Sequence, residues 1–135
     1  MNPVENKSLK NQTMSIENLS ILVVEDNDIN MEVIEFMLQS EGAIVYKARN
    51  GKEAVEQFGQ IKNLDLILMD LMMPIMDGYE ATLQIRKKDK KIPILAMSAN
   101  AYMQDIQKCY KAGMNGHISK PLYLEDLKDR IIQII

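Results

Sequence analysis

Residues 64–78, LDLILMDLMMPIMDG, decide the fold of this chain. The stretch begins with the segment Leu64–Met69, which is apolar apart from Asp65, and turns acidic at Asp70. A short apolar run of this kind predicts a strand covered on both faces, which is typical of parallel sheets. Pro74 and the turn signal Asp77-Gly78 come next and predict a loop that leads into a helix.

The same alternation of strand and helix recurs on both sides of this stretch. We predict strands at 21–24, 43–48, 64–69, 93–98 and 116–119, and helices at 27–40, 51–61, 78–87, 101–112 and 124–135. Such a succession implies a flavodoxin-like (βα)5 fold of class α/β, a doubly wound five-stranded parallel sheet with helices on both faces. In the first helix, helical spacing predicts four inward-facing residues: Val33, Ile34, Met37 and Leu38.

Composition limits what the chain can be. With 135 residues, 47% of them hydrophobic, one core is expected, with a linker or disordered tail at 1–19 and one domain at 20–135. A net charge of −3 leaves no excess of Lys and Arg for nucleic acid, so direct nucleic-acid binding is disfavoured. The single cysteine, Cys109, fits a reducing, cytoplasmic setting. The polar amino terminus lacks a signal peptide or membrane span, so we expect no membrane insertion by this segment.

Polar residues end or directly follow four of the predicted strands. They are Glu25 and Asp26 after the first, Asp70 after the third, Ser98 after the fourth and Lys120 after the fifth. Since the carboxyl ends of parallel strands meet at one edge of the sheet, these side chains are expected to converge. Three carboxylates repel one another unless a cation intervenes, and Mg²⁺ suits oxygen ligands.

The remaining two residues suit phosphoryl chemistry. Lys120 supplies a positive charge and Ser98 a hydrogen-bond donor, which would stabilise the charge that develops if Asp70 attacks a phosphoryl group. Taken singly, a strand-end Asp is usually a turn or cap residue, and Glu25-Asp26 could belong to the start of the next helix. The prediction rests on all five residues falling at strand ends together.

Four motifs resemble those of the receiver domains of two-component response regulators and hybrid sensor histidine kinases: ILVVEDNDIN at 21–30, DLILMDLMMPIMDGYEAT at 65–82, PILAMSANA at 93–101 and GMNGHISKP at 113–121. The likeness covers Ser20 to Ile135. It implies a phospho-accepting receiver in a two-component phosphorelay, which takes a phosphoryl group from a partner phosphohistidine in a reaction that depends on Mg²⁺.

The resemblance also implies the metal site. Asp70 would be the phosphoacceptor, Glu25 and Asp26 would organise Mg²⁺ with it, and the backbone carbonyl of Met72 would complete the protein ligands. The sulfurs of the methionines in this loop are too soft for magnesium, and packing is the favoured interpretation of these side chains: Met72, Met73 and Met76.

The same resemblance assigns the residues around the phosphoryl group. Ser98 and Lys120 would contact its oxygens, and the Lys120-Pro121 peptide bond is expected to be cis. Met72 and Asn100 flank the route to the phosphorus and would tune the lifetime of the phosphorylated state.

Switching is expected to begin at Ser98. Its hydroxyl would be drawn toward the phosphoryl group, and the surface formed by 101–112, 116–119 and 124–135 would change. The family usually has an aromatic residue at the position of His117. Two interpretations of His117 are open, a rotamer switch and an ordinary strand histidine with a partly buried ring.

The expected partner is a histidine kinase or a histidine phosphotransfer domain. By resemblance, its histidine-bearing helical bundle lies over the start of the first helix, where Asn27, Ile29 and Asn30 flank the acidic pair. Ile29 is either an exposed apolar contact or packed under the adjoining loop. We expect a stand-alone regulator or a domain of a hybrid kinase, including the cytoplasmic part of a membrane-bound one, that catalyses its own phosphorylation and dephosphorylation without being a conventional turnover enzyme.

Three alternatives are disfavoured. A haloacid-dehalogenase-type phosphatase needs a second Asp two residues after its nucleophile, where this chain has Met72. A dinucleotide-binding module needs a Gly-rich turn after the first strand, where Glu25-Asp26 would repel a pyrophosphate. A degenerate receiver that acts only as a binding module would not be expected to keep all five site residues.

Overall fold

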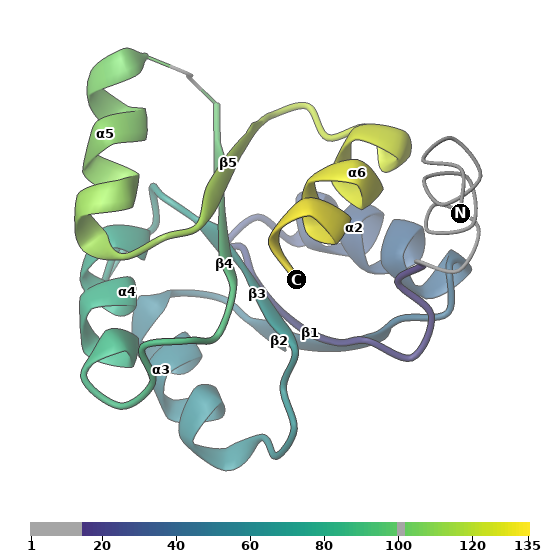
Figure 1. Ribbon diagram of the computed structural model, residues 1–135, viewed down its shortest axis with the longest axis horizontal. Coiled ribbons are helices and arrows are strands. Elements are labelled where there is room, and N and C mark those ends of the chain that lie inside the picture. The colour runs from purple at the N-terminus through teal and green to yellow at the C-terminus, as the bar shows by residue number, and fades with distance from the viewer. Residues whose placement is uncertain (1–14, 100–101) are drawn as a thin grey trace, which may run out of the picture.

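Five parallel strands form one sheet in the order β2-β1-β3-β4-β5 (Figure 1). The computed structural model describes residues 15–99 and 102–135. The strands are β1 Ser20–Val24, β2 Ile44–Ala48, β3 Leu66–Asp70, β4 Ile94–Ser98 and β5 Gly116–Ser119. The helices are α2 Asp28–Ser40, α3 Gly51–Gln60, α4 Gly78–Arg86, α5 Met103–Ala112 and α6 Leu124–Ile134. The doubly wound fold predicted from the sequence is confirmed.

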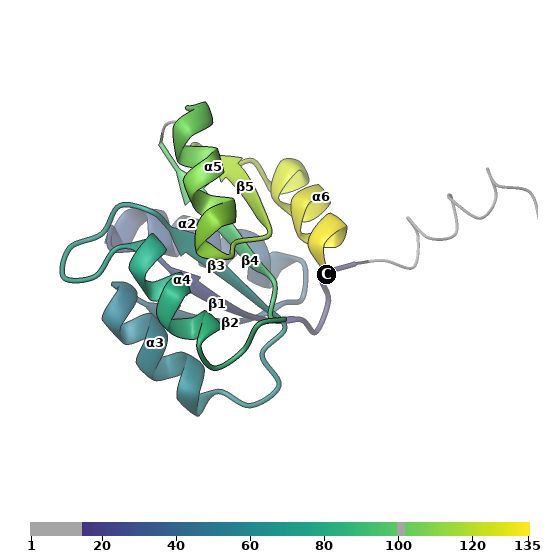
Figure 2. The same ribbon diagram turned by 60° about the vertical axis from the view of Figure 1, so that its left-hand side comes forward.

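Helices cover both faces of the sheet. Figure 2 shows α3, α4 and α5 along one face, while α2 and α6 lie on the other. The side chains of β3 divide between the two cores, because Ile67 and Met69 pack toward α4 and Leu66 and Leu68 pack toward α2. Since β3 is buried along its whole length, its position is fixed from both sides.

Side-chain caps start three of the helices close to strand ends. Asn27 Oδ1 accepts a hydrogen bond from the backbone N–H of Asn30 at 2.9 Å, at the start of α2. Asp77 Oδ1 accepts one from the N–H of Glu80 at 2.9 Å, at the start of α4, and Asn50 caps α3 in the same way. Such caps satisfy backbone donors that a helix leaves unpaired. They fix where each loop ends beside the rim of the sheet.

The inner face of α2 differs from the prediction at one position. Ile34 and Leu38 are buried as expected and Met37 is partly buried, but Val33 is 51% exposed, and Met31 is buried in its place. Met31 lies three residues before Ile34, so the two side chains share the face of the helix that meets the sheet. Val33 directly precedes Ile34 in the sequence, and its side chain therefore leaves the helix in a different direction.

Two further features lie at the edges of the predicted elements. Ile16, which precedes the predicted boundary at Ser20, is fully buried in the core beside α2. The helix expected at 101–112 begins at Met103, and position 101 falls outside the described residues. No helix among residues 15–99 and 102–135 is both long and apolar enough to cross a bilayer.

Candidate phosphoryl and metal site

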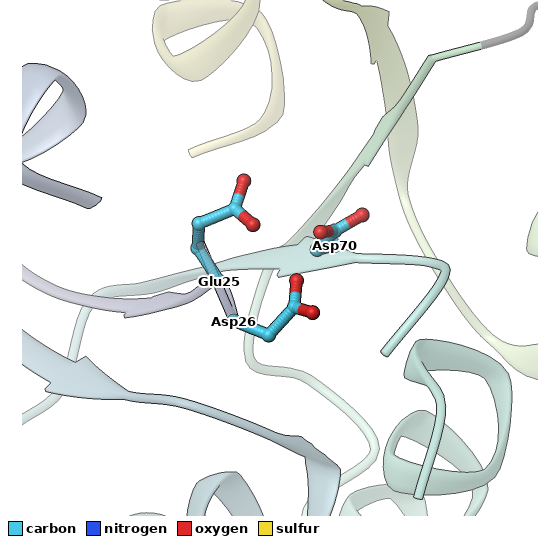
Figure 3. A group of neighbouring side chains, drawn as sticks. All are labelled: Glu25, Asp26 and Asp70. Atoms are coloured by element: carbon cyan, nitrogen blue, oxygen red, sulfur yellow. The ribbon is translucent and has the colours of Figure 1, made fainter. Parts of the chain in front are cut away.

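Three carboxylates meet at the carboxyl ends of β1 and β3. Glu25, Asp26 and Asp70 each offer an oxygen, and these oxygens all lie within 4.8 Å of one another (Figure 3). The residues Glu25 and Asp70 are buried, at 1% and 4% exposed, whereas Asp26 is exposed. The predicted convergence of these residues is present, with two of the carboxylates largely removed from water.

Backbone hydrogen bonds place these carboxylates. The N–H of Glu25 donates to the carbonyl of Ala48 at 3.0 Å, which extends the β1–β2 pairing by one residue. Asp70 is the last residue of β3 and pairs in register with Met97 of β4. The acidic ends of the neighbouring strands β1 and β3 therefore meet at the same point.

Lys120 joins the carboxylates from the loop after β5. Its Nζ donates to Glu25 Oε1 at 2.6 Å and to Asp70 Oδ2 at 3.2 Å. Burial by itself would lower the pKa of Lys120, but the hydrogen bonds and negative charge of Glu25 and Asp70 outweigh it and raise that pKa above its usual value. The ammonium is therefore charged at neutral pH. The expected cis peptide bond between Lys120 and Pro121 is present.

Ser98 lies at the end of β4, beside His117 of β5. Ser98 Oγ and His117 Nε2 are 2.7 Å apart, and both residues are buried. Burial lowers the pKa of His117, the positive charge of Arg130 lowers it further, and Asp105 opposes them. The ring of His117 is thus buried and bonded to Ser98, and its role as a rotamer switch stays a prediction.

A small cavity adjoins Ser98 on the side of α4 and α5. Its volume is about 280 Å³, and its lining includes Leu71, Met72, Tyr79, Ser98 and Tyr102. The cavity lies along the loop that follows Asp70, so the Ser98 side chain has space next to it.

The methionines of the loop after β3 behave differently from one another. Met73 and Met76 pack against the core, which confirms the packing interpretation for them. Met72 does not pack there, because it is 76% exposed, and that part of the interpretation is wrong. The N–H of Met72 lies 3.4 Å from Asp70 Oδ1, so its backbone is next to the carboxylate. Asn100 lies outside the described residues.

The start of α2 presents an apolar surface beside the acidic group. Ile29 is 71% exposed, so the interpretation in which it packs under a loop is wrong. Its two polar neighbours are also exposed: Asn27 and Asn30. Val33 and Phe36 continue the exposed face, and sequence reasoning did not single out Phe36. The signal was available, because 29, 33 and 36 follow the spacing of one helix face.

A shallow groove connects this surface to the carboxylates. It has a volume of about 130 Å³, and its lining includes Glu25 and Lys120 of the site. Val33 and Met37 of α2 and Pro121 also line it. We call the exposed residues Ile29, Val33 and Phe36, together with this groove, the α2 surface.

Residues 21–132 match the sequence model of the family described as Response regulator receiver domain. The chain is 41% identical over 128 residues to hybrid signal transduction histidine kinase B of Dictyostelium discoideum, a match that covers 85% of this chain and 6% of that protein. Among the first matching curated relatives, the chain spans only 6% to 17% of their length.

Solved structures show the same likeness. One is the co-crystal structure of the Saccharomyces cerevisiae histidine phosphotransfer signaling protein Ypd1 and the receiver domain of its downstream response regulator Ssk1, with a TM-score of 0.82, 30% identity and coverage of 90% of this chain and 91% of that one. Another is the receiver domain of sensor histidine kinase PA1611 from Pseudomonas aeruginosa, with magnesium coordinated in its active site cleft. Its TM-score is 0.77, with 42% identity and coverage of 86% of this chain and 95% of that one.

Proposed function

Because this chain belongs to the family of response regulator receiver domains of two-component phosphorelays, we propose that it accepts a phosphoryl group on Asp70. The observation that carries the proposal is the buried Asp70 carboxylate at the end of β3, with Lys120 Nζ at 3.2 Å and two further carboxylates beside it. A lone buried carboxylate would be costly, whereas this arrangement keeps Asp70 next to a cation and available as a nucleophile.

The transfer itself needs one bond to form and one to break. An Asp70 oxygen attacks the phosphorus of a phosphohistidine on the partner, the phosphorus–nitrogen bond breaks, and the imidazole leaves with the bonding electrons and takes up a proton. Lys120 is placed to offset negative charge on the phosphoryl oxygens, and the Ser98 hydroxyl is a candidate donor to them. Attack by water on the acyl phosphate then releases inorganic phosphate and restores Asp70.

The acidic group fits a magnesium ion. All of its ligand atoms are oxygens, and three carboxylates stand beside a single ammonium among the described residues, so the group retains negative charge. We propose that Glu25, Asp26, Asp70 and the backbone carbonyl of Met72 hold Mg²⁺, which when bound supplies positive charge to the transferring group. The magnesium found in the similar PA1611 receiver domain supports this proposal.

We propose that the α2 surface receives the phosphodonor, a histidine phosphotransfer domain or a histidine kinase. Ile29, Val33 and Phe36 are all exposed and follow one another along one face of α2, and exposed apolar residues that are grouped in this way mark interaction surfaces. The groove leads from this face to Glu25 and Lys120, so a bound helix would bring its histidine toward Asp70. The co-crystal of the similar Ssk1 receiver with Ypd1 supports this class of partner.

We further propose that phosphorylation changes the surface formed by α5, β5 and α6. Ser98 links the site to β5 through His117, and β5 is the edge strand between α5 and α6. A displacement of the Ser98 side chain toward the phosphoryl group would therefore change its contact with His117, and with it the packing of β5.

Incubation with acetyl phosphate and Mg²⁺, followed by intact mass measurement, tests the function. We expect the wild type to gain the mass of one phosphoryl group, and the gain to be absent without Mg²⁺ and in Asp70→Asn. Asp77→Asn is the matched control, because Asn also caps helices and Asp77 lies outside the acidic group. An unchanged mass of the wild type would contradict the proposal.

A further inference from the structure

The chain contains one histidine, and it is in contact with the hydroxyl proposed to meet the phosphoryl group. His117 Nε2 lies 2.7 Å from Ser98 Oγ, a short hydrogen bond between two buried side chains. Ser98 also lines the cavity beside the loop that follows Asp70, and it comes directly after Met97, the residue of β4 that pairs with Asp70. A bond of this kind in a buried place orients the hydroxyl firmly.

The protonation of the ring decides which way the hydroxyl hydrogen points. If Nε2 carries no hydrogen, Ser98 donates to it, and the hydroxyl hydrogen is used within the pair. If Nε2 carries a hydrogen, the ring donates to Ser98 Oγ, and the hydroxyl hydrogen can be donated to another acceptor. A doubly protonated ring can only donate, so it enforces the second arrangement.

We propose that His117 is a positioning residue that presents the Ser98 hydroxyl to the phosphoryl group, and that protonation of His117 and phosphorylation of Asp70 favour each other. The proposal rests on the proposed function of Asp70. In the phosphorylated protein, a chain of donors would run from Nε2–H to Oγ and from the hydroxyl to a phosphoryl oxygen. By linkage, a phosphoryl group that raises the proton affinity of the ring binds more favourably when the ring is protonated.

The surroundings of the ring set the pH at which this coupling acts. Ser98 of β4 carries no charge, while Arg130 of α6 lowers the pKa of His117 and Asp105 of α5 raises it. Burial is the largest influence, and it keeps that pKa below its usual value in the unphosphorylated protein. The coupling therefore favours phosphorylation increasingly as the pH falls from neutral through the pKa of the phosphorylated state toward that of the free protein.

A single-histidine titration by NMR tests the proposal on the intact chain. The ring signals of His117 are followed against pH in the presence of Mg²⁺, with and without beryllium trifluoride, a stable mimic of a phosphoryl group. We expect the mimic to raise the pKa of His117 by roughly half a unit to one unit. In Ser98→Ala the negative charge of the mimic remains but the donor chain is broken, so the rise should shrink to less than half.

The outcomes separate this proposal from the proposed function. If the mimic binds and the pKa of His117 is unchanged or lower, the positioning role is wrong while the function of Asp70 stands. An equal rise in the wild type and in Ser98→Ala would also overturn the role, because charge alone would then explain it. Absence of any binding by the mimic would contradict the function and the positioning role together.

Two substitutions at His117 supply a second readout, the pH profile of mimic affinity. In His117→Gln the amide N–H can donate to Ser98 at every pH, so we expect affinity near that of the protonated wild type and a flatter profile between about pH 5.5 and 8. In His117→Phe the donor is lost, and affinity should fall several-fold at low pH. Both variants retain every other residue of the site, so a wild-type profile no steeper than the profiles of these variants would overturn the proposal.

Discussion

At the scale of single residues, Lys120 balances the charge of the site. Two largely buried carboxylates face it, with Nζ at 2.6 Å from Glu25 and 3.2 Å from Asp70. Its own side chain is 22% exposed, so water screens the pair in part. The three groups proposed to act in phosphoryl transfer are therefore also expected to contribute to the stability of this end of the sheet.

Replacing Lys120 by methionine should destabilise the protein when no divalent metal is present. The change keeps the length of the side chain but leaves Glu25 and Asp70 without a cation, and we expect a loss of about 1–3 kcal/mol in the free energy of unfolding. Urea denaturation with and without Mg²⁺ measures it, and Mg²⁺ should restore more stability to Lys120→Met than to the wild type. Lys128→Met, which removes a pair with Glu41, is the control and should change stability by less than about 1 kcal/mol. Equal effects of the two substitutions would contradict this account.

Gly78 is a residue whose lack of a side chain shapes the site. A Cβ atom at Gly78 would collide with the backbone carbonyl oxygen of Asp70 and approach Leu71 and Met69. The start of α4 thus packs directly on the end of β3, and the position tolerates no side chain without movement of the Asp70 backbone.

Gly78→Ala should destabilise the fold by about 1–3 kcal/mol, because the overlap forces a backbone shift. It should also slow phosphorylation by acetyl phosphate. Gly59→Ala in α3 is the matched control, since a Cβ there meets open space near Lys88. We expect that variant to be neutral or to gain up to about 1 kcal/mol from helix propensity. Thermal denaturation measures the stability of both variants, and their rates of phosphorylation by acetyl phosphate are compared with that of the wild type. A Gly78→Ala variant as stable as Gly59→Ala would contradict the prediction.

Sequence reasoning located the five strand-end residues because it depended only on the order of the strands and the polarity of the residues at their carboxyl ends. It did not foresee the bond between His117 and Ser98. That contact depends on the register of β4 against β5, in which Ala96 pairs with His117, and no local pattern fixes a register between strands.

At the scale of elements, Arg86 ties the end of α4 to the turn between α5 and β5. Its guanidinium donates to the carbonyl of Gly113 at 2.9 Å, to Asn115 Oδ1 at 2.9 Å and to the carbonyl of Asp89 at 3.1 Å. Asn115 Oδ1 also accepts a hydrogen bond from the N–H of Ile94, so the hydrogen bonds made by the forked Arg86 guanidinium extend to the start of β4. Burial lowers the pKa of Arg86, which nevertheless remains charged at neutral pH.

Arg86→Lys should cost about 1–3 kcal/mol of unfolding free energy, since an ammonium cannot reproduce three bonds made by a planar fork. Arg49→Lys, at an exposed pair with Asp28, is the matched control and should change stability by less than about 1 kcal/mol. Chemical denaturation of the two variants compares them directly. A loss at Arg86 no larger than that at Arg49 would show that the fork contributes little.

The elements themselves were predictable to within a few residues. Apolar runs bounded by Gly, Pro and acidic residues marked the strands, and the caps Asn27 and Asp77 stand where the chain turns from loop to helix. The inner face of α2 was predicted less well. Val33 and Met31 are both apolar, and only the packing of the helix against the sheet decides which of them is buried.

At the scale of the whole molecule, the site adjoins two parts of the surface. The α2 surface adjoins Glu25 and Lys120, whereas Ser98 and His117 lead to β5, between α5 and α6. A partner that delivers a phosphoryl group at one surface need not cover the other. The arrangement thus allows donor binding and output to be separated.

Phe36→Ala should weaken transfer from a phosphorylated histidine phosphotransfer protein about tenfold, because Phe36 is 74% exposed in the free domain and would be buried in the complex. Phosphorylation by acetyl phosphate should be unchanged, since that donor needs no docking face. Leu83→Ala, at an exposed position of α4, is the control and should leave both rates as they are. A loss of rate with both donors would place the effect in the site instead of the interface.

The most direct test of the central claim is to find the atom that carries the phosphoryl group. After reaction with acetyl phosphate and Mg²⁺, borohydride reduces an acyl phosphate on aspartate to homoserine, which peptide mass spectrometry locates. We predict that homoserine appears at position 70 and that its formation depends on Mg²⁺. The amount of homoserine should be smaller in Lys120→Met than in the wild type. Homoserine at position 26, or none at position 70 in a protein that has gained a phosphoryl group, would contradict the account.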